Sequence, residues 1–330
     1  MSFTNEELLD MYEDIVFARV LGEKIIEYIF SGKIAGSIHP CLGQEAVSAG
    51  LIAAFKKSDI KNYGTGTHRS QTVMAHRVGL KPFIGELLCR TGGENDGISG
   101  EYHLTSVEKT MIPATGALGG AWPILTGFAW GLKASGRKRE IAFAPYGDGA
   151  ISQGSTYEAM NLAALYKLPI LYFIENNGIA MATPVEKQSP LENLADRASA
   201  FNMKGVTVDG NDPVAVAEAV LEGMELAANC EPNVVEAKMM RWEGHYVGDD
   251  QAYRDTSFRK DLDAIDPVLK FKEKLLSMGI LDEGKAAEIR AEKEKLVEDT
   301  FDEQLKYGLP TREQVLDYNR IYSNDAGGEL

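Results

Sequence analysis

The amino-acid sequence predicts an α/β fold, with a parallel β-sheet covered by helices on both faces. The first observation is a set of short apolar runs, typical of buried parallel strands, at 141–146, 169–175 and 233–239. The second is the helical periodicity of the segments between them, 153–167 and 212–229. Strands that alternate with helices in this way form a parallel sheet with helices on each side.

A long helix is expected at the N-terminus. Thr4 and Glu7 form a capping-box pattern, apolar residues then recur near the helical period, and Ser31-Gly32 marks the end. Residues 34–120 are rich in Gly, Thr, Ser and His, with short helices between. We expect this stretch to supply binding loops rather than core.

The second half of the chain continues the alternation and ends in helices. A further strand is expected at 206–208, and Asp212-Pro213 begins the next helix, because proline suits the first helical position. After Glu243 comes a loop rich in Gly, Asp and Tyr. Asp266-Pro267 begins another helix, and a charged helix covers 282–307.

We therefore expect a single domain over residues 1–330. It would consist of a helical segment at about 1–60, an α/β core at 61–245, and a loop with C-terminal helices at 246–330. The tail 323–330 is expected to be loosely held, since chain ends are poorly ordered unless they are tied down.

Composition and charge exclude several classes of protein. The 330 residues include 34 basic and 49 acidic ones, a net charge of −15 that would repel nucleic acid. Hydrophobic residues make up 44%, enough for a core. No apolar run reaches the ~18 residues of a membrane span. The acidic first ten residues resemble no targeting segment, and three widely spaced cysteines fit a reduced, cytoplasmic setting.

Polar residues follow two of the predicted strands. Gly147-Asp148-Gly149 comes after one strand and Asn176-Asn177 after the next. One strand–helix–strand unit separates them, so both strand ends meet at one edge of the sheet, where α/β proteins bind ligands. A carboxylate and an amide oxygen at that edge suit Mg²⁺ carrying a diphosphate, and the glycines let phosphate approach the backbone closely.

This pattern resembles the thiamine-diphosphate signature of the transketolase and 2-oxoacid decarboxylase superfamily. Over nearly its whole length the chain resembles the E1 α subunits of the 2-oxoacid and acetoin dehydrogenase complexes. The matching stretches are His39–Ala46, Thr67–Arg69, Gly116–Gly119, the signature itself and Gly244–Asp249. The last of these, followed by Gln251-Ala252-Tyr253-Arg254, looks more like the acetoin branch than the pyruvate branch, and so does Thr67-His68-Arg69.

The resemblance implies a thiamine-diphosphate-binding fold of the diphosphate-binding type, together with a set of site residues. Asp148, Asn177 and the main-chain carbonyl of Ile179 would hold Mg²⁺. His245 and His39 would line the entrance as catalytic histidines. Thiamine diphosphate would contact the following residues: His68, Arg69, Gly116, Leu118, Gly147, Asp148, Gly149, Ala150, Asn177, Ile179 and His245.

Two stretches depart from the family pattern. Gln71 stands where the family has a histidine shortly after this arginine, and glutamine cannot transfer a proton near neutral pH. The family's Gly-Gly-Ser-Met-His loop is replaced by Ser99-Gly100-Glu101-Tyr102-His103. We expect both changes on the substrate side of the cofactor, so they leave cofactor binding intact and the substrate open.

The resemblance implies an E1 α subunit that cleaves acetoin to acetaldehyde and an acetyl unit, which passes to lipoamide on an E2 partner. Activation of thiamine diphosphate needs a carboxylic acid, which this family carries on a separate β chain. We therefore expect an α₂β₂ heterotetramer with a β subunit, and an inactive single chain. No nucleic-acid or membrane partner is expected.

Three alternatives stay open at this point. The chain would serve a pyruvate or branched-chain 2-oxoacid dehydrogenase complex, or it would be a thiamine-diphosphate-dependent C–C lyase or ligase without E2. A non-catalytic scaffold subunit is the third alternative, and the intact pair Asp148 and Asn177 argues against it.

Overall fold

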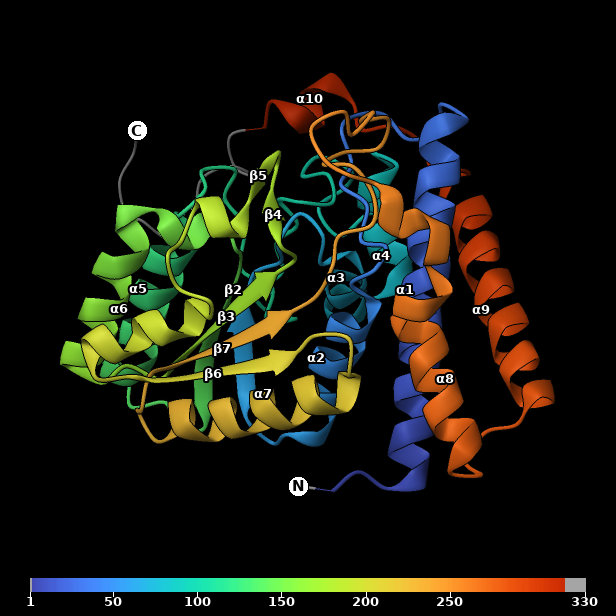
Figure 1. Ribbon diagram of the computed structural model, residues 1–330. Coiled ribbons are helices and arrows are strands. Elements are labelled where there is room, and N and C mark those ends of the chain that lie inside the picture. Colours follow the sequence, from blue (N-terminus) through green and yellow to red (C-terminus); the bar gives the residue numbers. More distant parts are fainter. Residues whose placement is uncertain (1, 318–330) are drawn as a thin grey trace.

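The computed structural model describes residues 2–317, and its centre is a five-stranded parallel sheet (Figure 1). The strand order is β1-β2-β3-β7-β6. The strands are β1 (Lys61–Gly64), β2 (Glu140–Gly147), β3 (Ile170–Asn176), β6 (Lys204–Asp209) and β7 (Asn233–Lys238). The predicted parallel sheet is confirmed, and the four predicted strands are β2, β3, β6 and β7.

The register brings three strand ends to one edge of the sheet. Gly147 at the end of β2 lies opposite Glu175 of β3, and Asn176 lies opposite Lys238 at the end of β7. The segments that follow these strands therefore begin side by side, as the sequence predicts. A short antiparallel pair, β4 (Ile179–Ala180) and β5 (Thr183–Pro184), projects beyond the same edge (Figure 1).

Helices cover both faces of the sheet, which confirms the predicted layers. On one face lie α2 (Glu45–Lys57) and α7 (Pro213–Ala228), and on the other lie α5 (Ala121–Ala134) and α6 (Gly154–Tyr166) (Figure 1). Side chains alternate between the two cores. Phe143 and Phe173 belong to the core beneath α2 and α7, whereas Tyr172 belongs to the core beneath α5 and α6. Burial on both faces explains why these strands are continuous apolar runs.

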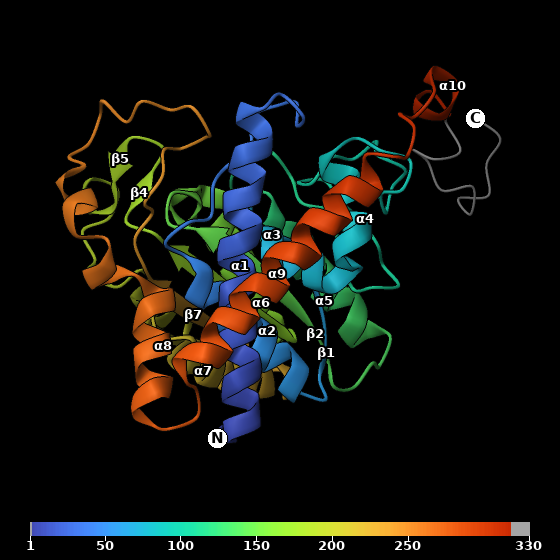
Figure 2. The ribbon, with the colours of Figure 1, turned by 90° about the vertical axis from the view of Figure 1, so that its right-hand side faces the viewer.

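A helical layer outside α2 is formed by both ends of the chain. α1 (Asn5–Phe30) contacts α2, α8 (Pro267–Ser277) and α9 (Glu283–Gln304), and α9 crosses α1 obliquely (Figure 2). The predicted helix starts are confirmed: the Thr4 capping box opens α1, Asp212 caps α7 and Asp266 caps α8. Asp282 caps α9 in the same way.

The expectation that residues 34–120 supply binding loops rather than core is wrong for the helices of this stretch, although its loops do line the cavity described below. The helices α2, α3 (Gln71–Val78) and α4 (Leu80–Leu87) contribute to the main core, and every residue of α2 from Glu45 to Ala54 is buried. Small residues permit this packing. A Cβ on Gly50 would lie 2.7 Å from the carbonyl oxygen of Pro213, so glycine is needed where α2 approaches α7. The composition of the whole stretch does not describe α2, which consists mostly of Ala and other apolar residues.

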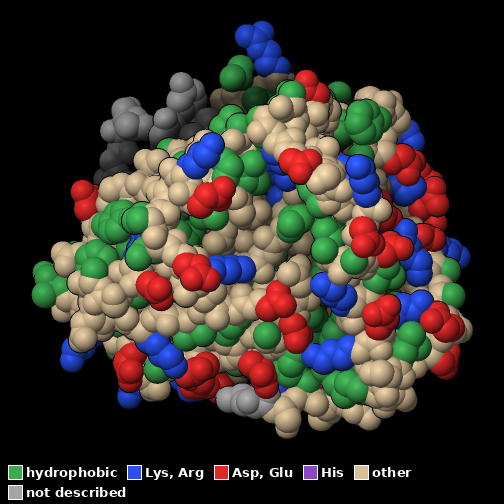
Figure 3. Space-filling model, viewed as in Figure 1, with side chains coloured by type: hydrophobic (Ala, Val, Ile, Leu, Met, Phe, Trp, Pro, Cys, Tyr) green, Lys and Arg blue, Asp and Glu red, His purple; other side chains and the backbone are tan. Residues whose placement is uncertain are grey.

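Among the other described segments, the 3-10 helix Leu194–Phe201 precedes β6, and the short helix α10 (Arg312–Val315) lies near the end of the described part. Within residues 2–317, no helix combines the length and the apolar character needed to cross a membrane. Acidic and basic side chains are interspersed over the side formed by α8 (Figure 3). The predicted loose tail, 323–330, lies outside the described residues.

Candidate functional site

A cavity of about 460 Å³ opens where β2 and β3 end. Every site residue that the sequence predicts lines it, although the stretches that carry them lie far apart in the chain. These residues are His39, His68, Arg69, Gly116, Leu118, Gly147, Asp148, Gly149, Ala150, Asn177, Ile179 and His245. The structure therefore brings the whole predicted set together around one space.

Asp148 contributes a carboxylate to this cavity, and the hydrogen-bonding capacity of that carboxylate is not fully used. The side chain follows β2 and is 3% exposed, and its Oδ2 atom has no hydrogen-bond partner. Burial raises the pKa of Asp148 to about 6, although the main-chain amide of Asn177 and the charges of Arg241 and Arg69 act to lower it. An unpartnered buried carboxylate oxygen is costly, and a bound cation would offset that cost.

Asn177 and Ile179 offer two further oxygens near the end of β3. The Asn177 side chain donates to Gln44 Oε1 at 3.2 Å, and its Oδ1 accepts a long hydrogen bond of 3.4 Å from the Ile179 amide. The Ile179 carbonyl accepts from Arg241 Nη1 at 3.3 Å and keeps one lone pair for another partner. With Asp148, these oxygens form a donor set suited to a hard divalent cation.

Glycines leave part of the cavity wall as bare backbone. A Cβ added to Gly116 or Gly147 would meet no atom within 4 Å, so both positions face open space. Gly149 is required for a different reason, since its Cβ would lie 2.4 Å from that of Ala180. Leu118 is 56% exposed and lines the cavity, so it is not a core leucine. A ligand can approach the main chain closely here.

Two buried guanidinium groups make the cavity a site for anions. Arg69 donates to the carbonyl oxygens of Pro40 at 2.7 Å and His245 at 2.9 Å, and its Nε has no partner. Arg241 is 1% exposed and donates to the Met181 carbonyl at 2.9 Å. Burial lowers the pKa of both, that of Arg69 to about 9. A phosphate or carboxylate ligand would restore the charge balance.

Arg241 was not among the predicted site residues. The signal for it is the position of a cation just after β7, at the edge of the sheet where Asp148 and Asn177 also lie. Because the sequence prediction concentrated on the signature after β2 and β3, it overlooked the third strand end.

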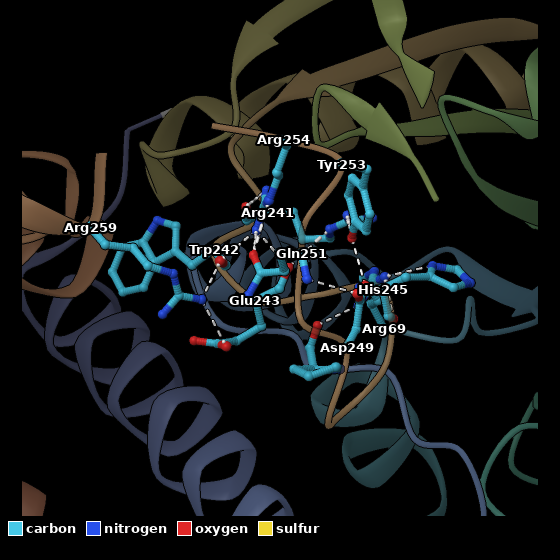
Figure 4. Close-up of polar contacts among 11 residues, drawn as sticks. Arg69, Arg241, Trp242, Glu243, His245, Asp249, Gln251, Tyr253, Arg254 and Arg259 are labelled. Carbon is cyan, nitrogen blue, oxygen red and sulfur yellow. Dashed lines mark hydrogen bonds and ion pairs between the residues drawn. The ribbon is translucent and has the colours of Figure 1, made fainter. Parts of the chain in front are cut away.

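The segment 241–254 forms a tightly hydrogen-bonded loop beside the cavity (Figure 4). Asp249 Oδ2 accepts from the His245 amide and from the Tyr253 hydroxyl, each at 2.6 Å. Arg254 reaches back to the carbonyl oxygens of Arg241, at 2.7 Å, and Trp242, at 2.6 Å. The acetoin-like string of the sequence is therefore the part of the chain that fixes His245.

Three histidines meet at the entrance of the cavity. The ring centroid of His39 lies 4.5 Å from that of His68 and 4.7 Å from that of His245. One nitrogen of each lies within 4.8 Å of the others, a spacing at which the three could hold a metal ion. Burial, followed by the positive charge of Arg69, lowers the pKa of all three, that of His39 to about 4. These imidazoles are neutral at pH 7.

A buried carboxylate holds the turn that carries Arg69. Glu175, near the end of β3, accepts hydrogen bonds from the hydroxyl groups of Thr67 at 2.7 Å and Ser70 at 3.0 Å. Burial raises the pKa of Glu175, while these two hydroxyls and Arg69 lower it. The strand end and the Thr67-His68-Arg69 turn are thereby joined, which fixes where the guanidinium enters the cavity.

The two departures from the family pattern meet beside the cavity. Gln71 donates to the carbonyl oxygens of His39 at 2.9 Å and His68 at 3.0 Å. Glu101 lines the cavity and is 6% exposed, and burial raises its pKa to about 8. His103, by contrast, is exposed and is not among the lining residues.

The loop before Glu101 takes its shape from another buried carboxylate. Glu86, on α4, accepts hydrogen bonds from the main-chain amides of Gly97 at 2.9 Å and Ser99 at 3.1 Å, and from the Ser99 hydroxyl at 2.8 Å. Glu86 itself is fully buried and does not line the cavity. A second hydrogen bond holds the loop just after Glu101, because the Tyr102 hydroxyl donates to the Thr115 carbonyl at 2.8 Å.

Comparison with known proteins shows which family the chain matches. The family model described as "Dehydrogenase E1 component" matches residues 13–313. The α subunit of acetoin:2,6-dichlorophenolindophenol oxidoreductase from Bacillus subtilis (strain 168) is 35% identical over 279 residues, which cover 84% of this chain and 83% of that protein. The subunit of the same name from Cupriavidus necator is 32% identical, over 94% of this chain and 93% of that protein.

Relatives named for pyruvate match to a similar degree. The pyruvate dehydrogenase E1 component subunit alpha of Rhizobium meliloti (strain 1021) is 32% identical over 302 residues, which cover 91% of this chain and 86% of that protein. Likeness alone therefore does not separate acetoin from pyruvate. From the match over 13–313 and these relatives, the chain belongs to the dehydrogenase E1 component family, whose members depend on thiamine diphosphate.

Proposed function

We propose that this chain is the α subunit of a thiamine-diphosphate-dependent acetoin dehydrogenase E1. The observation that carries the proposal is the unpartnered Oδ2 of Asp148, which lies in a cavity with bare glycine backbone and two buried guanidinium groups. These are the features that a magnesium-bound diphosphate would need. In this proposal all of residues 1–330 serve as one E1 α domain, and the protein works in the cytoplasm.

The cavity residues fit thiamine diphosphate with Mg²⁺. Asp148, Asn177 and the Ile179 carbonyl would hold the metal. The diphosphate would accept hydrogen bonds from Arg69 and Arg241 and from the main-chain amides of Gly149 and Ala150, while Gly116 and Leu118 would face the pyrimidine. When bound, the cofactor supplies a nucleophilic carbon and an electron sink for cleavage of the bond next to a carbonyl group.

In this proposal the chain's own residues transfer protons and hold the groups of the site in place. His39, His68 and His245 are neutral, so each ring can accept a proton at one nitrogen and hold one at the other. Asp249 and Arg69 fix His245 through its main chain. The Thr67 and Ser70 hydroxyls and the Glu175 carboxylate hold the turn of Arg69 in place.

We favour acetoin over pyruvate as the substrate because of one loop. The stretch Gly244–Asp249 with Gln251–Arg254, which looks acetoin-like, makes the hydrogen bonds that fix His245 (Figure 4). The first relative above, at 35% identity, is also named for acetoin. An E1 α subunit of a pyruvate or branched-chain complex is the second candidate, favoured by the 32% identity to a pyruvate dehydrogenase subunit.

A β subunit is part of the proposal, with a lipoyl-bearing E2 as the acceptor of the acetyl unit. E1 α subunits of this family generally pair with a β subunit. The outer side of α5 and α6 exposes large apolar side chains, at the left of the molecule in Figure 3. Their exposed fractions are 50% for Ile124, 40% for Trp130, 70% for Leu165 and 44% for Tyr166. An exposed apolar face of this kind is typical of an interface.

The test is dye reduction by this chain mixed with its native β partner, thiamine diphosphate and Mg²⁺. Acetoin, pyruvate and a branched 2-oxoacid are compared at equal concentration. We expect reduction with acetoin, and none by this chain without its partner. Turnover by the single chain would refute the need for a β subunit, and a preference for pyruvate would move the function to the second candidate.

A binding experiment tests the site itself. Asp148→Ala should abolish Mg²⁺-dependent binding of thiamine diphosphate, measured by calorimetry on the α–β complex. Asp299→Ala, an exposed carboxylate on α9, is the matched control and should bind as the wild type does. Unchanged affinity in Asp148→Ala would overturn the site assignment.

A further inference from the structure

Two buried oxygens beside the cavity lack a hydrogen-bond donor. They are Oε1 of Gln71 and Oε2 of Glu101. The Gln71 amide nitrogen is already committed to the His39 and His68 carbonyls, so the side chain cannot be reversed without breaking both bonds. The Gln71 side chain also approaches Glu101 closely enough to affect its pKa. Burial, the larger effect, raises the pKa of Glu101, whereas this contact with Gln71 lowers it.

Protonation of Glu101 would turn its unpartnered Oε2 into a hydrogen-bond donor. An ionised carboxylate only accepts hydrogen bonds, whereas a carboxylic acid also donates one. A proton on Oε2 of Glu101 would satisfy that atom and give a donor to the acceptors around it. Burial favours this state, because it raises the pKa of Glu101 to about 8. Glu101 is therefore a neutral acid at pH 7.

The groups around Glu101 do not supply a competing charge. The Cys41 thiol is buried and lies near enough to Glu101 for the Glu101 charge to affect its pKa. Burial is the main cause that raises this pKa to about 12. Tyr102, the next residue, has a pKa raised to about 12 by burial. His39 and His68, whose carbonyls hold Gln71, are neutral. Arg69 lines the same cavity, but its hydrogen bonds go to Pro40 and His245.

We propose that Glu101 is a catalytic residue that gives a proton to the carbonyl oxygen of an α-hydroxyketone substrate and takes it back from the substrate's hydroxyl group. Glu101 lines the cavity and is more than nine-tenths buried, and its Oε2 has no hydrogen-bond partner. This inference rests on the proposed function, because the thiazolium cofactor supplies the nucleophile and the electron sink.

The proton balance closes on Glu101 for this class of substrate. As the nucleophile adds to the carbonyl carbon, the oxygen takes the Glu101 proton and becomes a hydroxyl, which leaves a carboxylate. When the neighbouring C–C bond breaks, its electron pair stays with the former carbonyl carbon, and the hydroxyl on the leaving carbon becomes the carbonyl of an aldehyde. The proton of that hydroxyl returns to Glu101. A 2-oxoacid has no such hydroxyl and would draw the proton from water.

The protonation state is tested directly on the full chain. Infrared difference spectra at pH 7 between the wild type and Glu101→Gln should show the C=O stretch of a protonated carboxyl group, lost in the variant. Glu108→Gln, an exposed glutamate on the same loop, is the matched control and should not remove the band. Absence of the band in the wild type at pH 7 would overturn the proposal.

The catalytic role is tested in the α–β complex with acetoin and with pyruvate. Glu101→Gln should lower kcat for acetoin by about 100-fold, the usual size of an acid–base contribution, and lower kcat for pyruvate less. Glu101→Asp should recover part of the loss. The fall of kcat as pH rises through about 8 in the wild type should disappear in Glu101→Gln.

Binding of thiamine diphosphate separates the two proposals. If the wild-type complex fails to bind the cofactor, the proposed function falls. If the complex binds cofactor and turns over acetoin, but Glu101→Gln keeps the wild-type kcat and pH profile, then only the role of Glu101 is refuted. Equal loss with acetoin and pyruvate would refute the return of the proton from the substrate hydroxyl.

Discussion

The hydroxyl group of Thr67 donates a hydrogen bond of 2.7 Å to the Glu175 carboxylate, although 108 positions separate the two residues. Glu175 is 7% exposed near the end of β3, and Thr67 lies in the turn that leads to Arg69. The bond therefore sets the guanidinium relative to the strand ends from which Asp148 and Asn177 project.

Thr67→Val should weaken this link while keeping the shape of the side chain. Glu175 would lose one of two hydroxyl donors, which should lower the free energy of unfolding by about 1–3 kcal/mol. Because Arg69 would be held less firmly, the affinity for thiamine diphosphate should fall about tenfold. Chemical denaturation and calorimetry measure the two effects, with Thr183→Val, on exposed β5, as the control. Wild-type stability in Thr67→Val would show that the bond is not needed.

Arg241→Met should reduce binding of the diphosphate. Its guanidinium is buried beside the cavity, and a charge-assisted hydrogen bond to a phosphate oxygen is worth about 1.5–3 kcal/mol, or roughly 10- to 100-fold in affinity. Titration of the α–β complex with thiamine diphosphate measures this loss. Arg137→Met, which removes a surface arginine paired with Glu140, should leave affinity unchanged. Equal affinities in the two variants would remove Arg241 from the site.

The stability of the chain should depend on pH through Glu101. Its pKa is raised from 4.5 to about 8 on folding, so the folded chain binds a proton that the unfolded chain releases between these values. This contribution of Glu101 to stability is therefore fully present below about pH 4.5 and is lost as pH rises toward 8, by up to roughly 5 kcal/mol. Glu101→Gln should gain stability relative to the wild type from pH 5 to pH 8. Denaturation at both values measures the difference, and a constant difference would contradict the shift.

His39 should act in the opposite direction. Its pKa falls from 6.5 to about 4 on folding, so the unfolded chain binds a proton that the folded chain does not. The stability present above pH 6.5 is lost as pH falls toward 4, by up to about 3 kcal/mol. His39→Asn should reduce this acid sensitivity, measured by denaturation at pH 7 and pH 5. His103→Asn, at an exposed position, serves as the comparison.

Ile124→Glu should prevent association with the β subunit. Ile124 is 50% exposed on α5 within the apolar side formed with α6, and a charge there would have to be buried on assembly. Analytical ultracentrifugation of the mixed subunits should show free chains, while the thermal stability of the variant alone stays close to the wild type. Leu296→Glu alters an equally exposed residue on α9, at the other side of the molecule (Figure 1), and should assemble normally. Assembly of both variants would place the interface elsewhere.

Elements with local signals were predictable from the sequence. The capping residues Thr4, Asp212 and Asp266 satisfy the helix ends within three positions in the chain, so their patterns are readable without tertiary context. The strands β2 and β3 were visible because burial on both faces requires continuous apolar residues. The signature that follows them placed Asp148 and Asn177 at one edge, because the topology of parallel strands requires it.

Other elements could not be predicted from the sequence, because contacts with residues distant in the chain stabilise them. β1 has one large apolar side chain, Tyr63, in four residues, and it is a strand because β2 pairs with it. α5 contains Pro123, Gly127 and Gly131, which argue against a helix. Pro123 is tolerated in the first turn, where its missing N–H has no intrahelical partner. Arg241 was missed because its importance lies in its burial, and Gln71 and Glu101 were noticed only as departures from the family pattern, without the burial that raises the pKa of Glu101.

The loop that carries Glu101 is held by Glu86, which lies outside the cavity and accepts the amides of Gly97 and Ser99. The shape of the loop is therefore set by a residue that does not line the cavity. The Glu101 side chain can be exchanged without removing these hydrogen bonds or disturbing the end of the cavity that holds Asp148. Within such a scaffold a lineage can acquire a new substrate by a few substitutions while it inherits its cofactor chemistry unchanged.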